Sequence, residues 1–387
     1  MLADTDAGSI VTAAQSGAQW GYRLLLWQAL LIPILYVVQE LTIRLGMVTG
    51  RGHAELIKER YGALWAWISV GSLVASCAGA LLTELSGLAG VGELFGVPTW
   101  VTLALVVGGL LLMAATHTYL TVERIAIAIG AFELVFLLVA WLAHPRLADV
   151  AAGIADLPAA DPKYLYLVSA NIGAVIMPWM VFFQQASIVE RKLGVEDLGP
   201  ARLDTAIGAV VTQLVMAAAL VAVAATLGRA GGAAKLDTVQ QIASAITPYL
   251  GKVGGRILFG LGMAGAALVA AIVVTLTAAR ALAEVVGAKN GLDHEPTEAP
   301  WFYGAYAVVL LVAAAVVGSG ADLVALSVGV QVMNSLLLPV VLGFLFLLAC
   351  GLPRPWRLEG AYAWLAGALI AATVAVGVYA GVAGLWN

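Results

Sequence analysis

Charged residues are scarce in this chain. Asp, Glu, Lys and Arg make up 11% of its 387 residues, whereas hydrophobic residues make up 62% and the mean hydropathy is +0.98. An average soluble domain is about 25% charged. The shortage of charge excludes an ordinary soluble fold, and the chain is predicted to be an all-α membrane protein that crosses the bilayer several times.

Other patterns are missing too, and each absence excludes a class of protein. The two cysteines, Cys77 and Cys350, lie in apolar surroundings, which argues against a disulfide framework and for buried, unreactive thiols. No basic stripe is present, so nucleic-acid binding is not expected. The N-terminus has acidic residues where a signal peptide has basic ones. No Ser/His/Asp or His-x-x-x-His arrangement falls in an apolar segment, so the chain is not expected to be an enzyme.

Long apolar segments are abundant. A membrane span needs roughly 20 apolar residues, and ten such spans are predicted at 23–45, 63–93, 99–116, 123–143, 164–189, 204–227, 254–285, 301–317, 322–350 and 360–385. The apolar segment 8–19 is too short to cross ~30 Å at 1.5 Å per residue, which is typical of one half of a broken helix. Residues 46–62 and 144–163 are expected to be loops, with a short amphipathic helix around Val239–Ile246. The glycines of 260–265 are expected to pack helices together within the monomer.

The positions of Lys and Arg predict the orientation. If residues 46–62 are cytoplasmic, 12 of the 19 Lys and Arg residues lie inside and 7 outside, which agrees with the positive-inside rule. Trp20, Trp100, Trp301 and Trp356 fall at predicted span ends, where indole rings anchor helices at the membrane surface. We therefore expect a multi-pass integral protein of the plasma (inner) membrane, with the lipid bilayer as its surroundings.

Two apolar segments carry signals that interrupt a helix. Residues 173–179 read Gly-Ala-Val-Ile-Met-Pro-Trp, and Pro178 has no N–H and clashes with the carbonyl four residues earlier. Residues 4–9 read Asp-Thr-Asp-Ala-Gly-Ser and place two carboxylates and a glycine directly before another apolar segment. A broken backbone survives in lipid only where protein buries it or where it lines a cavity. Two interrupted segments in corresponding halves of a membrane chain indicate a transporter binding site near the bilayer midplane.

These breaks and their surroundings resemble the Nramp family of divalent metal transporters. In that family an Asp-Pro-Gly-Asn motif is followed by Gly-Ala-x-aromatic-Gly-Tyr, and residues 6–9 and 16–22 follow this pattern at the same spacing. The similarity runs from residue 4 to about residue 350. Its other parts are Leu45-Gly46, Thr49-Gly50 and Ala54-Glu55, the sixth-helix break at Ile172–Pro178, and Gln331, which resembles the glutamine of the tenth helix.

The resemblance implies a LeuT-type fold with two inverted five-helix repeats, in which helices one and six are unwound at the site. Here the repeats would be residues 1–143 and 164–350, followed by one extra helix at 360–385, all within a single transporter domain of residues 1–387. In the family about forty more residues, including the inner half of helix one, precede the motif. We therefore expect that the first half-helix is missing from this chain, either by truncation or because its start codon was placed too far downstream.

Five residues are candidate ligands of a divalent cation. Asp6 supplies a negative charge, and an ionisable residue within a span is a functional hypothesis by default. Ser9 stands where the family has asparagine and offers a hydroxyl oxygen, with a helix N-cap as the alternative. Ala174 would offer a backbone carbonyl freed by the unwound turn. Gln331 would complete the ligand set directly or through water, with an interhelical hydrogen bond as the alternative.

Met177 is the fifth candidate, and it bears on which metal is transported. A thioether suits soft or borderline transition metals and does little for Mg²⁺ or Ca²⁺, which prefer oxygen. Met177 thus favours Mn²⁺ or Fe²⁺, whereas Ser9 and other departures from the family motif leave an Nramp-related Mg²⁺ transporter as the alternative. The divalent ion is the substrate, no cofactor is expected, and no protein partner is inferred.

Several of the titratable groups that couple metal entry to protons in the family are absent from this chain. Asp4 would add a second carboxylate or bind a proton, or it faces only the aqueous vestibule. Trp179 stands where the sixth helix of the family has a histidine, and Gln184 or Gln185 occupies the region of a second one. Glu84 matches a family glutamate that carries a proton, whereas Glu133 is a second intramembrane acid without an obvious partner.

All four histidines are expected in loops or at span ends, and the span 301–317 holds no charged residue where the family has arginines. We therefore expect import of the cation by alternating access with weak or no proton coupling. Two further readings stay open. One is an organic-solute transporter on the same fold, which the charge of Asp6 opposes, and the other is a non-transporting sensor.

Overall fold

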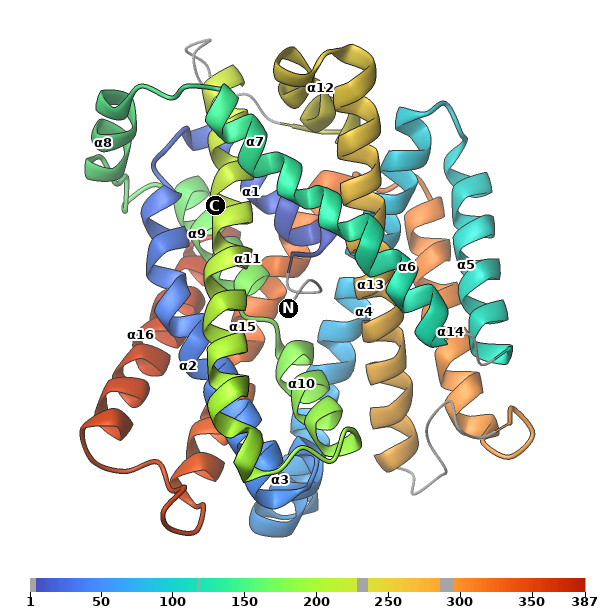
Figure 1. Ribbon diagram of the computed structural model, residues 1–387, viewed down its shortest axis with the longest axis vertical. Helices are drawn as coiled ribbons and strands as arrows, with labels where there is room; N and C mark the ends of the chain where they lie inside the picture. Colours follow the sequence, from blue (N-terminus) through green and yellow to red (C-terminus); the bar gives the residue numbers. More distant parts are fainter. Residues whose placement is uncertain (1–4, 117–118, 228–235, 286–294, 387) are drawn as a thin grey trace.

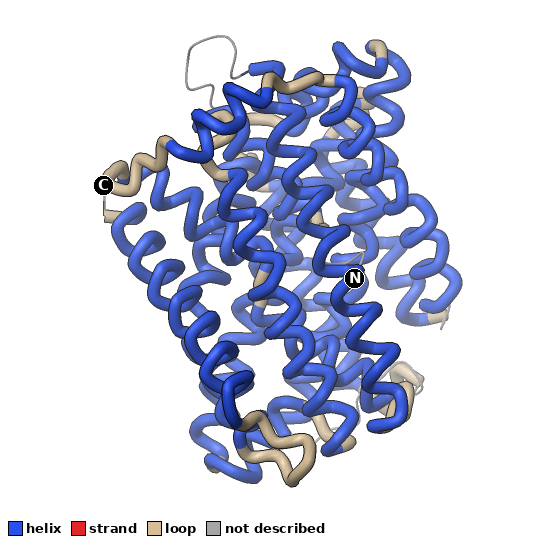
Figure 2. Tube along the Cα trace, turned by 60° about the vertical axis from the view of Figure 1, so that its left-hand side comes forward, coloured by secondary structure: helices blue, strands red, loops and turns tan. Residues whose placement is uncertain are grey.

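The computed structural model describes residues 5–116, 119–227, 236–285 and 295–386. Every regular element in these ranges is helical, as Figure 2 shows, and no strand occurs within them. Nine of the described helical segments are long and apolar enough to cross a membrane. The described part of the chain is thus a bundle of long helices that run side by side (Figure 1).

The helices follow one another in the order α1 (Ala7–Trp20), α2 (Leu25–Thr49), α3 (His53–Tyr61), α4 (Ala63–Leu94), α5 (Thr99–Ala115), α6 (Tyr119–Gly130), η2 (Ala131–Leu134), α7 (Val135–Leu142), α8 (Leu147–Ala155), α9 (Pro162–Val175), α10 (Pro178–Glu190), η3 (Val195–Asp197), α11 (Leu198–Leu227), α12 (Val239–Leu250), α13 (Lys252–Val285), α14 (Pro300–Gly318), α15 (Leu323–Cys350) and α16 (Gly360–Leu385). The elements η2 and η3 are 3₁₀ turns. Nine of the ten predicted spans match the nine described segments that could cross a membrane, whereas the predicted span 99–116 forms the shorter apolar helix α5, which has 17 residues. The half-length segment is confirmed as α1, and the short amphipathic helix is confirmed as α12.

Two segments predicted to be loops contain helices. Residues 53–61 form α3, whose first turn carries Glu55 and whose last turn carries Lys58 and Arg60. Acidic residues at the start of a helix and basic residues at its end complement the helix dipole. The other loop prediction, 144–163, is wrong for Leu147–Ala155, where alanines favour helix α8.

The predicted break at Pro178 is confirmed. Helix α9 ends at Val175 and α10 begins at Pro178, with Ile176 (φ −117°, ψ 93°) and Met177 (φ −97°, ψ 134°) extended between them. Figure 1 places this interruption at mid-height in the bundle, close to the start of α1. A second interruption, which was not predicted, is the 3₁₀ turn η2 within the span 123–143.

Glycines bring α13 close to its neighbours, as predicted for the segment 260–265. A Cβ atom at Gly262 would lie 3.0 Å from the backbone nitrogen of Glu133, and one at Gly265 would overlap the backbone of Gly130. Gly260 packs in the same way against the ring of Phe95. Small residues thus let α13 contact both the predicted span 123–143 and the end of α4.

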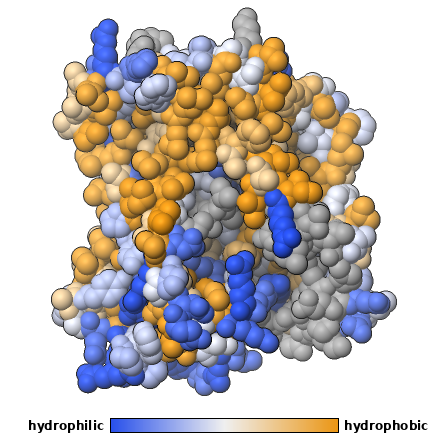
Figure 3. All heavy atoms as spheres, in the orientation of Figure 1, coloured by the Kyte–Doolittle hydropathy of each residue, from blue (hydrophilic) through white to orange (hydrophobic). Residues whose placement is uncertain are grey.

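Polar side chains gather at one end of the molecule. Figure 3 shows them at its lower end, where α3 lies, below a surface that is mostly apolar. This is the end that the distribution of Lys and Arg assigns to the cytoplasm. The orientation itself stays a prediction.

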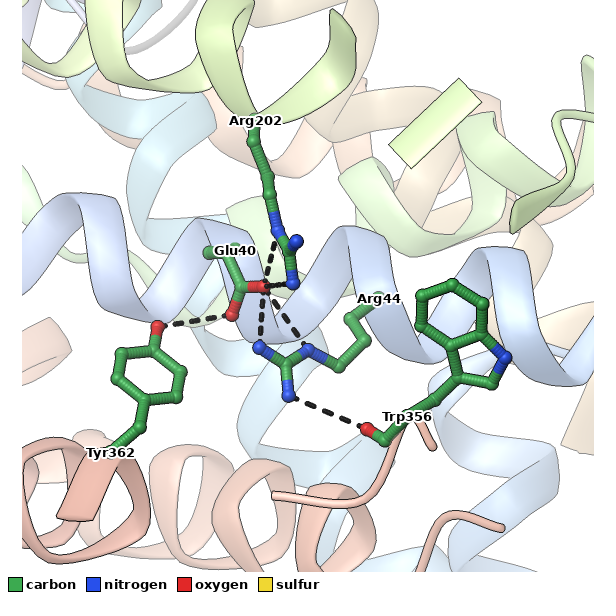
Figure 4. A network of polar contacts seen from close by, with 5 residues as sticks. All are labelled: Glu40, Arg44, Arg202, Trp356 and Tyr362. Atoms are coloured by element: carbon green, nitrogen blue, oxygen red, sulfur yellow. Dashed lines mark hydrogen bonds and ion pairs between the residues drawn. The ribbon is translucent and has the colours of Figure 1, made fainter. Parts of the chain in front are cut away.

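A buried carboxylate joins three helices near this end. Glu40 of α2 is 1% exposed, and its Oε1 atom lies 2.6 Å from Nη2 of Arg44 and 2.7 Å from Nη2 of Arg202 on α11. Its Oε2 atom accepts a hydrogen bond of 3.1 Å from the hydroxyl of Tyr362 on α16. Figure 4 shows the carboxyl group between the two guanidinium groups. Each charge is paired and hydrogen-bonded, as burial of charge requires.

Removing this carboxylate should destabilise the fold strongly. Glu40→Ala leaves two guanidinium groups without their common partner, and breaking a buried ion pair costs about 3–5 kcal/mol. Thermal unfolding of the detergent-solubilised protein measures the loss as a drop in Tm. Glu359→Ala is the control, since its pair with Arg354 is exposed and such pairs are worth at most about 1 kcal/mol. Equal drops in Tm for the two variants would contradict this account of the network.

Candidate metal centre

The start of α1 places Asp6 in the core of the bundle. Asp6 is the N-cap of the helix and fully buried, and its Oδ1 accepts a hydrogen bond of 2.7 Å from the backbone N–H of Ser9. Its backbone carbonyl accepts from the N–H of Ile10 at 3.1 Å. A carboxylate in this position satisfies a free N–H and faces the positive end of the helix dipole. The helix therefore holds a carboxylate within the apolar bundle.

Ser9 and Ala174, two of the predicted ligands, are in direct contact. The hydroxyl of Ser9 donates a hydrogen bond of 2.8 Å to the backbone carbonyl of Ala174, which lies in the last turn of α9. Because Asp6 is the N-cap of α1, the alternative prediction that Ser9 caps the helix is wrong. This contact joins the start of α1 to the broken helix.

Met177 occupies the break between α9 and α10. It is the N-cap of α10, directly before Pro178, and it is fully buried. Its carbonyl accepts a hydrogen bond of 3.1 Å from the N–H of Met180, so the first turn of α10 starts directly after this residue. The thioether is therefore held in the interior on an extended backbone.

Gln331 of α15 is buried against both breaks. A Cβ atom at Gly8 would overlap the side-chain nitrogen of Gln331, and one at Gly173 would overlap its backbone oxygen. Its Oε1 accepts a hydrogen bond of 3.0 Å from Asn334 of the same helix, and Asn334 accepts one of 2.8 Å from Ser76 of α4. Its Nε2 has no hydrogen-bond partner among the described residues. Gln331 thus lies between α1 and α9, and it connects them to α4 through Asn334.

Glu84 of α4 lies beside Asp6. Its Oε2 accepts a hydrogen bond of 3.1 Å from the N–H of Ala7, and its Oε1 accepts one of 2.9 Å from the hydroxyl of Thr83. The carboxyl group of Glu84 also lies close enough to that of Asp6 for the two charges to interact. The structure therefore brings the predicted proton-carrying residue to the predicted metal ligand.

Of the remaining two predicted residues, only Trp179 is described, and it adds no titratable group. Trp179 is fully buried with its ring centroid 6.5 Å from that of Phe183, and its indole N–H has no partner among the described residues. Asp4 lies outside the described residues. Among the described residues no group of three or more His, Cys, Asp or Glu side chains could hold a metal. The candidate centre instead combines carboxylate, hydroxyl, carbonyl, thioether and amide groups.

A histidine contact at the end of the molecule where α3 lies was not predicted. His53 lies at the start of α3 and is buried, and its Nδ1 is 3.0 Å from Oε1 of Gln185 on α10. Its ring also meets Phe182 edge to face, with the centroids 4.8 Å apart. Burial lowers the pKa of His53 to about 4, against the opposing effect of the Gln185 hydrogen bond. The prediction that His53 lies in a loop is wrong, and the side chain instead fastens α3 to α10.

A cavity of about 620 Å³ lies beside this contact, between α3, α4, α10 and α13. Phe182 and Phe183 line it on α10, and Glu190 and Arg280 form an ion pair of 2.6 Å at its wall. None of the predicted ligands lines this cavity, and all five are fully buried. The candidate centre is closed off from this cavity in this arrangement.

The family pattern described as Natural resistance-associated macrophage protein-like, or Nramp, matches residues 1–383. The chain belongs to the Nramp family. A relative from Chromohalobacter salexigens, named divalent metal cation transporter MntH, is 29% identical over 294 residues, which are 71% of this chain and 66% of the relative. A relative of the same name from Brucella suis is 26% identical over 70% of this chain and 62% of its own length. The chain thus spans less than two thirds of the length of either relative.

Two solved structures share the fold. A manganese transporter of Eremococcus coleocola superposes with a TM-score of 0.73 at 18% identity, covering 100% of this chain and 86% of that one. A nucleobase-cation-symport-1 family transporter gives 0.57 at 16% identity, covering 100% and 88%. These likenesses confirm the predicted all-α LeuT-type fold. Family membership and the nine apolar helical segments also confirm a multi-pass membrane protein. The repeat boundaries and the ligand roles stay predictions.

Acid should loosen the contact between α3 and α10. Above about pH 6.5 His53 is neutral whether or not it is buried, and the contact keeps its full stability. Between about pH 6.5 and pH 4 the exposed imidazole takes up a proton that the buried one refuses, so up to about 3 kcal/mol of stability is lost. The difference in Tm between the wild type and His53→Gln, followed from neutral pH downward, measures this loss. A difference that does not change with pH would contradict it.

Proposed function

We propose that the protein transports a divalent transition-metal cation, Mn²⁺ or Fe²⁺, into the cytoplasm by alternating access. The observation that carries the proposal is the hydrogen bond between Ser9 and Ala174, which joins the start of α1, where Asp6 lies, to the end of α9 just before Met177. The names of the relatives and of the Eremococcus coleocola structure support the same substrate class. The plasma membrane is the proposed location.

In the proposed site each ligand supplies a different kind of donor. Asp6 balances charge, Ala174 gives a carbonyl dipole, and Met177 gives a soft donor that favours Mn²⁺ or Fe²⁺ over Mg²⁺. The Ser9 hydroxyl, which now donates to Ala174, would turn a lone pair towards the cation. These four groups come from only two segments, so a small shift of α1 against the break opens or closes the site.

Gln331 becomes a ligand if its amide turns over. Its nitrogen now faces the start of α1, whereas its oxygen accepts from Asn334. If the amide of Asn334 turns over as well, Asn334 accepts a hydrogen bond from Gln331 and donates one to Ser76. Both hydrogen bonds between these three side chains are then kept, each in the opposite direction. The oxygen of Gln331 then faces the cation, and neither of these two hydrogen bonds is lost.

The proposed inner gate lies along α10. Phe182 and Phe183 lie about 7–9 Å beyond Met177 along the axis of α10, at 1.5 Å per residue. They line the cavity between α3, α4, α10 and α13, which we propose opens to the cytoplasm, and separate it from the site. The contact of Gln185 with His53 holds this helix against α3. Release of the cation requires α10 to move away from α4 and α13, which widens the cavity towards Met177.

Proton coupling is proposed to be weak. Trp179 offers no titratable group, and the described titratable groups next to Asp6 are the carboxyl groups of Glu84 and Glu133. A dication also needs no protons to be driven inward, since a membrane potential of 100 mV supplies about 4.6 kcal/mol for two charges. The potential alone is therefore a sufficient driving force.

An organic-solute transporter is less well supported. In that reading the N–H groups at a helix start would bind the carboxylate of the substrate. Here the N–H groups of Ala7 and Ser9 are already bonded to Glu84 and Asp6. A bound carboxylate would meet two acids and no free donor at these positions. The Mg²⁺ alternative depends on whether Met177 contributes to binding.

Metal titration by isothermal calorimetry tests the proposal. Wild type is expected to bind Mn²⁺ more tightly than Mg²⁺, and Asp6→Ala to lose Mn²⁺ binding because the charged ligand is gone. Met177→Ala should weaken Mn²⁺ by roughly tenfold or more, whereas Mg²⁺ should hardly respond because it gains little from a thioether. Met113→Ala, a buried methionine of α5 outside the site, is the control for packing. Mg²⁺ binding that equals Mn²⁺ binding and ignores Met177 would move the protein to the Mg²⁺ alternative, and binding of neither ion would overturn the proposal.

A further inference from the structure

A buried acid near the candidate centre has no role in the site described so far. Glu133 is 2% exposed and lies in η2, the 3₁₀ turn that interrupts the predicted span 123–143 between α6 and α7. A 3₁₀ stretch within a helix often marks strain or a functional position. Ionisable side chains within the membrane are rare and usually functional.

The packing of α13 fixes the position of this turn. A Cβ atom at Gly262 would lie 3.0 Å from the backbone nitrogen of Glu133, and one at Gly265 would overlap the backbone of Gly130. The backbone of the turn is therefore pressed against α13. With the backbone held in this way, the burial of Glu133 places its carboxyl group in the interior and away from lipid.

The carboxyl group of Glu133 faces the residues that precede α1. It accepts a hydrogen bond from the side chain of Thr5, and it lies close enough to Asp6 for the two charges to interact. Its Oε1 atom is buried and has no hydrogen-bond partner among the described residues. A buried carboxylate oxygen without a donor is costly unless a ligand meets it. The unpartnered oxygen thus points to a ligand between η2 and the start of α1.

Acids flank the start of α1 from two different helices. Glu84 of α4 bonds the N–H of Ala7, and Glu133 of η2 bonds Thr5. Asp6 lies between Thr5 and Ala7 in the sequence, and its charge interacts with those of Glu84 and Glu133. A cation at Asp6 therefore has an oxygen-only environment towards Thr5, which differs in chemistry from the thioether of Met177.

We propose that Glu133 and Thr5 form a second cation subsite next to Asp6, which holds a hard and partly hydrated divalent cation such as Mn²⁺ or Mg²⁺. Hard cations of this kind keep several waters and need only one or two carboxylates from the protein. The subsite gives this chain oxygen ligands that compensate for the serine at position 9. It also biases binding towards Mn²⁺ and against softer ions such as Cd²⁺, which gain more from the thioether. This inference rests on the proposed metal transport.

Calorimetric titrations of Mn²⁺, Mg²⁺ and Cd²⁺ test the subsite. Glu133→Gln keeps the size of the side chain and its ability to accept from Thr5 but removes the charge. It is expected to weaken Mn²⁺ and Mg²⁺ by roughly tenfold and Cd²⁺ by less than about threefold. Met177→Ala should show the opposite order, with Cd²⁺ weakened most. Glu93→Gln makes the same change of charge at the exposed end of α4 and should alter no affinity.

The outcomes separate this inference from the proposed function. Wild type that binds no divalent ion contradicts metal transport itself, whereas wild-type affinity for Mn²⁺ in a folded Glu133→Gln overturns only the subsite. Glu133→Asp, which keeps the charge, supplies a second measurement that does not depend on the glutamine variant. Mn²⁺ should induce a carboxylate band in the infrared difference spectrum of the wild type, and this band should shift in Glu133→Asp. An unchanged band in a folded Glu133→Asp variant also overturns the subsite.

Discussion

The close packing of α15 against two glycines is the constraint on which the candidate centre depends. Gly8 at the start of α1 and Gly173 at the end of α9 both lie against Gln331, and neither has room for a Cβ atom. The start of α1 and the end of α9, which are far apart in the sequence, are thereby held against the same residue of α15. The Ser9–Ala174 hydrogen bond then joins them directly. Without this approach the ligands of a transported ion would remain on separate helices.

The electrostatics of the site follow from the way α1 begins. A helix start leaves N–H groups without partners, and here the carboxylates of Asp6 and Glu84 take the N–H groups of Ser9 and Ala7. The helix therefore stabilises negative charge in the membrane interior before any cation arrives. The arrangement suits a cation and opposes an anionic substrate. Near the end of the molecule where α3 lies, the carboxylate of Glu40 likewise holds α2, α11 and α16 together (Figure 4).

Local signals in the sequence predicted much of this. Pro178 determined the break, the apolar segments determined the spans, and Asp6 and Met177 stood out as polar or soft groups at interruptions. The missed features depend on contacts between distant residues. The partner of His53 is Gln185, 132 positions away, and the partner of Glu133 is Thr5. Neither residue type nor spacing identifies such partners, because tertiary packing selects them. The sequence predicts loops where α3 and α8 form, because the first of these connecting segments is charged and the second is rich in alanine.

The central claim is that the packing of α1 and α9 against Gln331 assembles the metal site, and a methyl group inserted at this contact tests it most directly. Gly173→Ala forces α9 away from α15, whereas Gly343→Ala adds the same methyl group to α15 where nothing lies within 4 Å. Overpacking of this kind costs about 1–3 kcal/mol, which a folded membrane protein can tolerate. The account predicts that Gly173→Ala folds but loses Mn²⁺ binding, while Gly343→Ala binds Mn²⁺ like the wild type. Equal Mn²⁺ affinity in the two variants would contradict it.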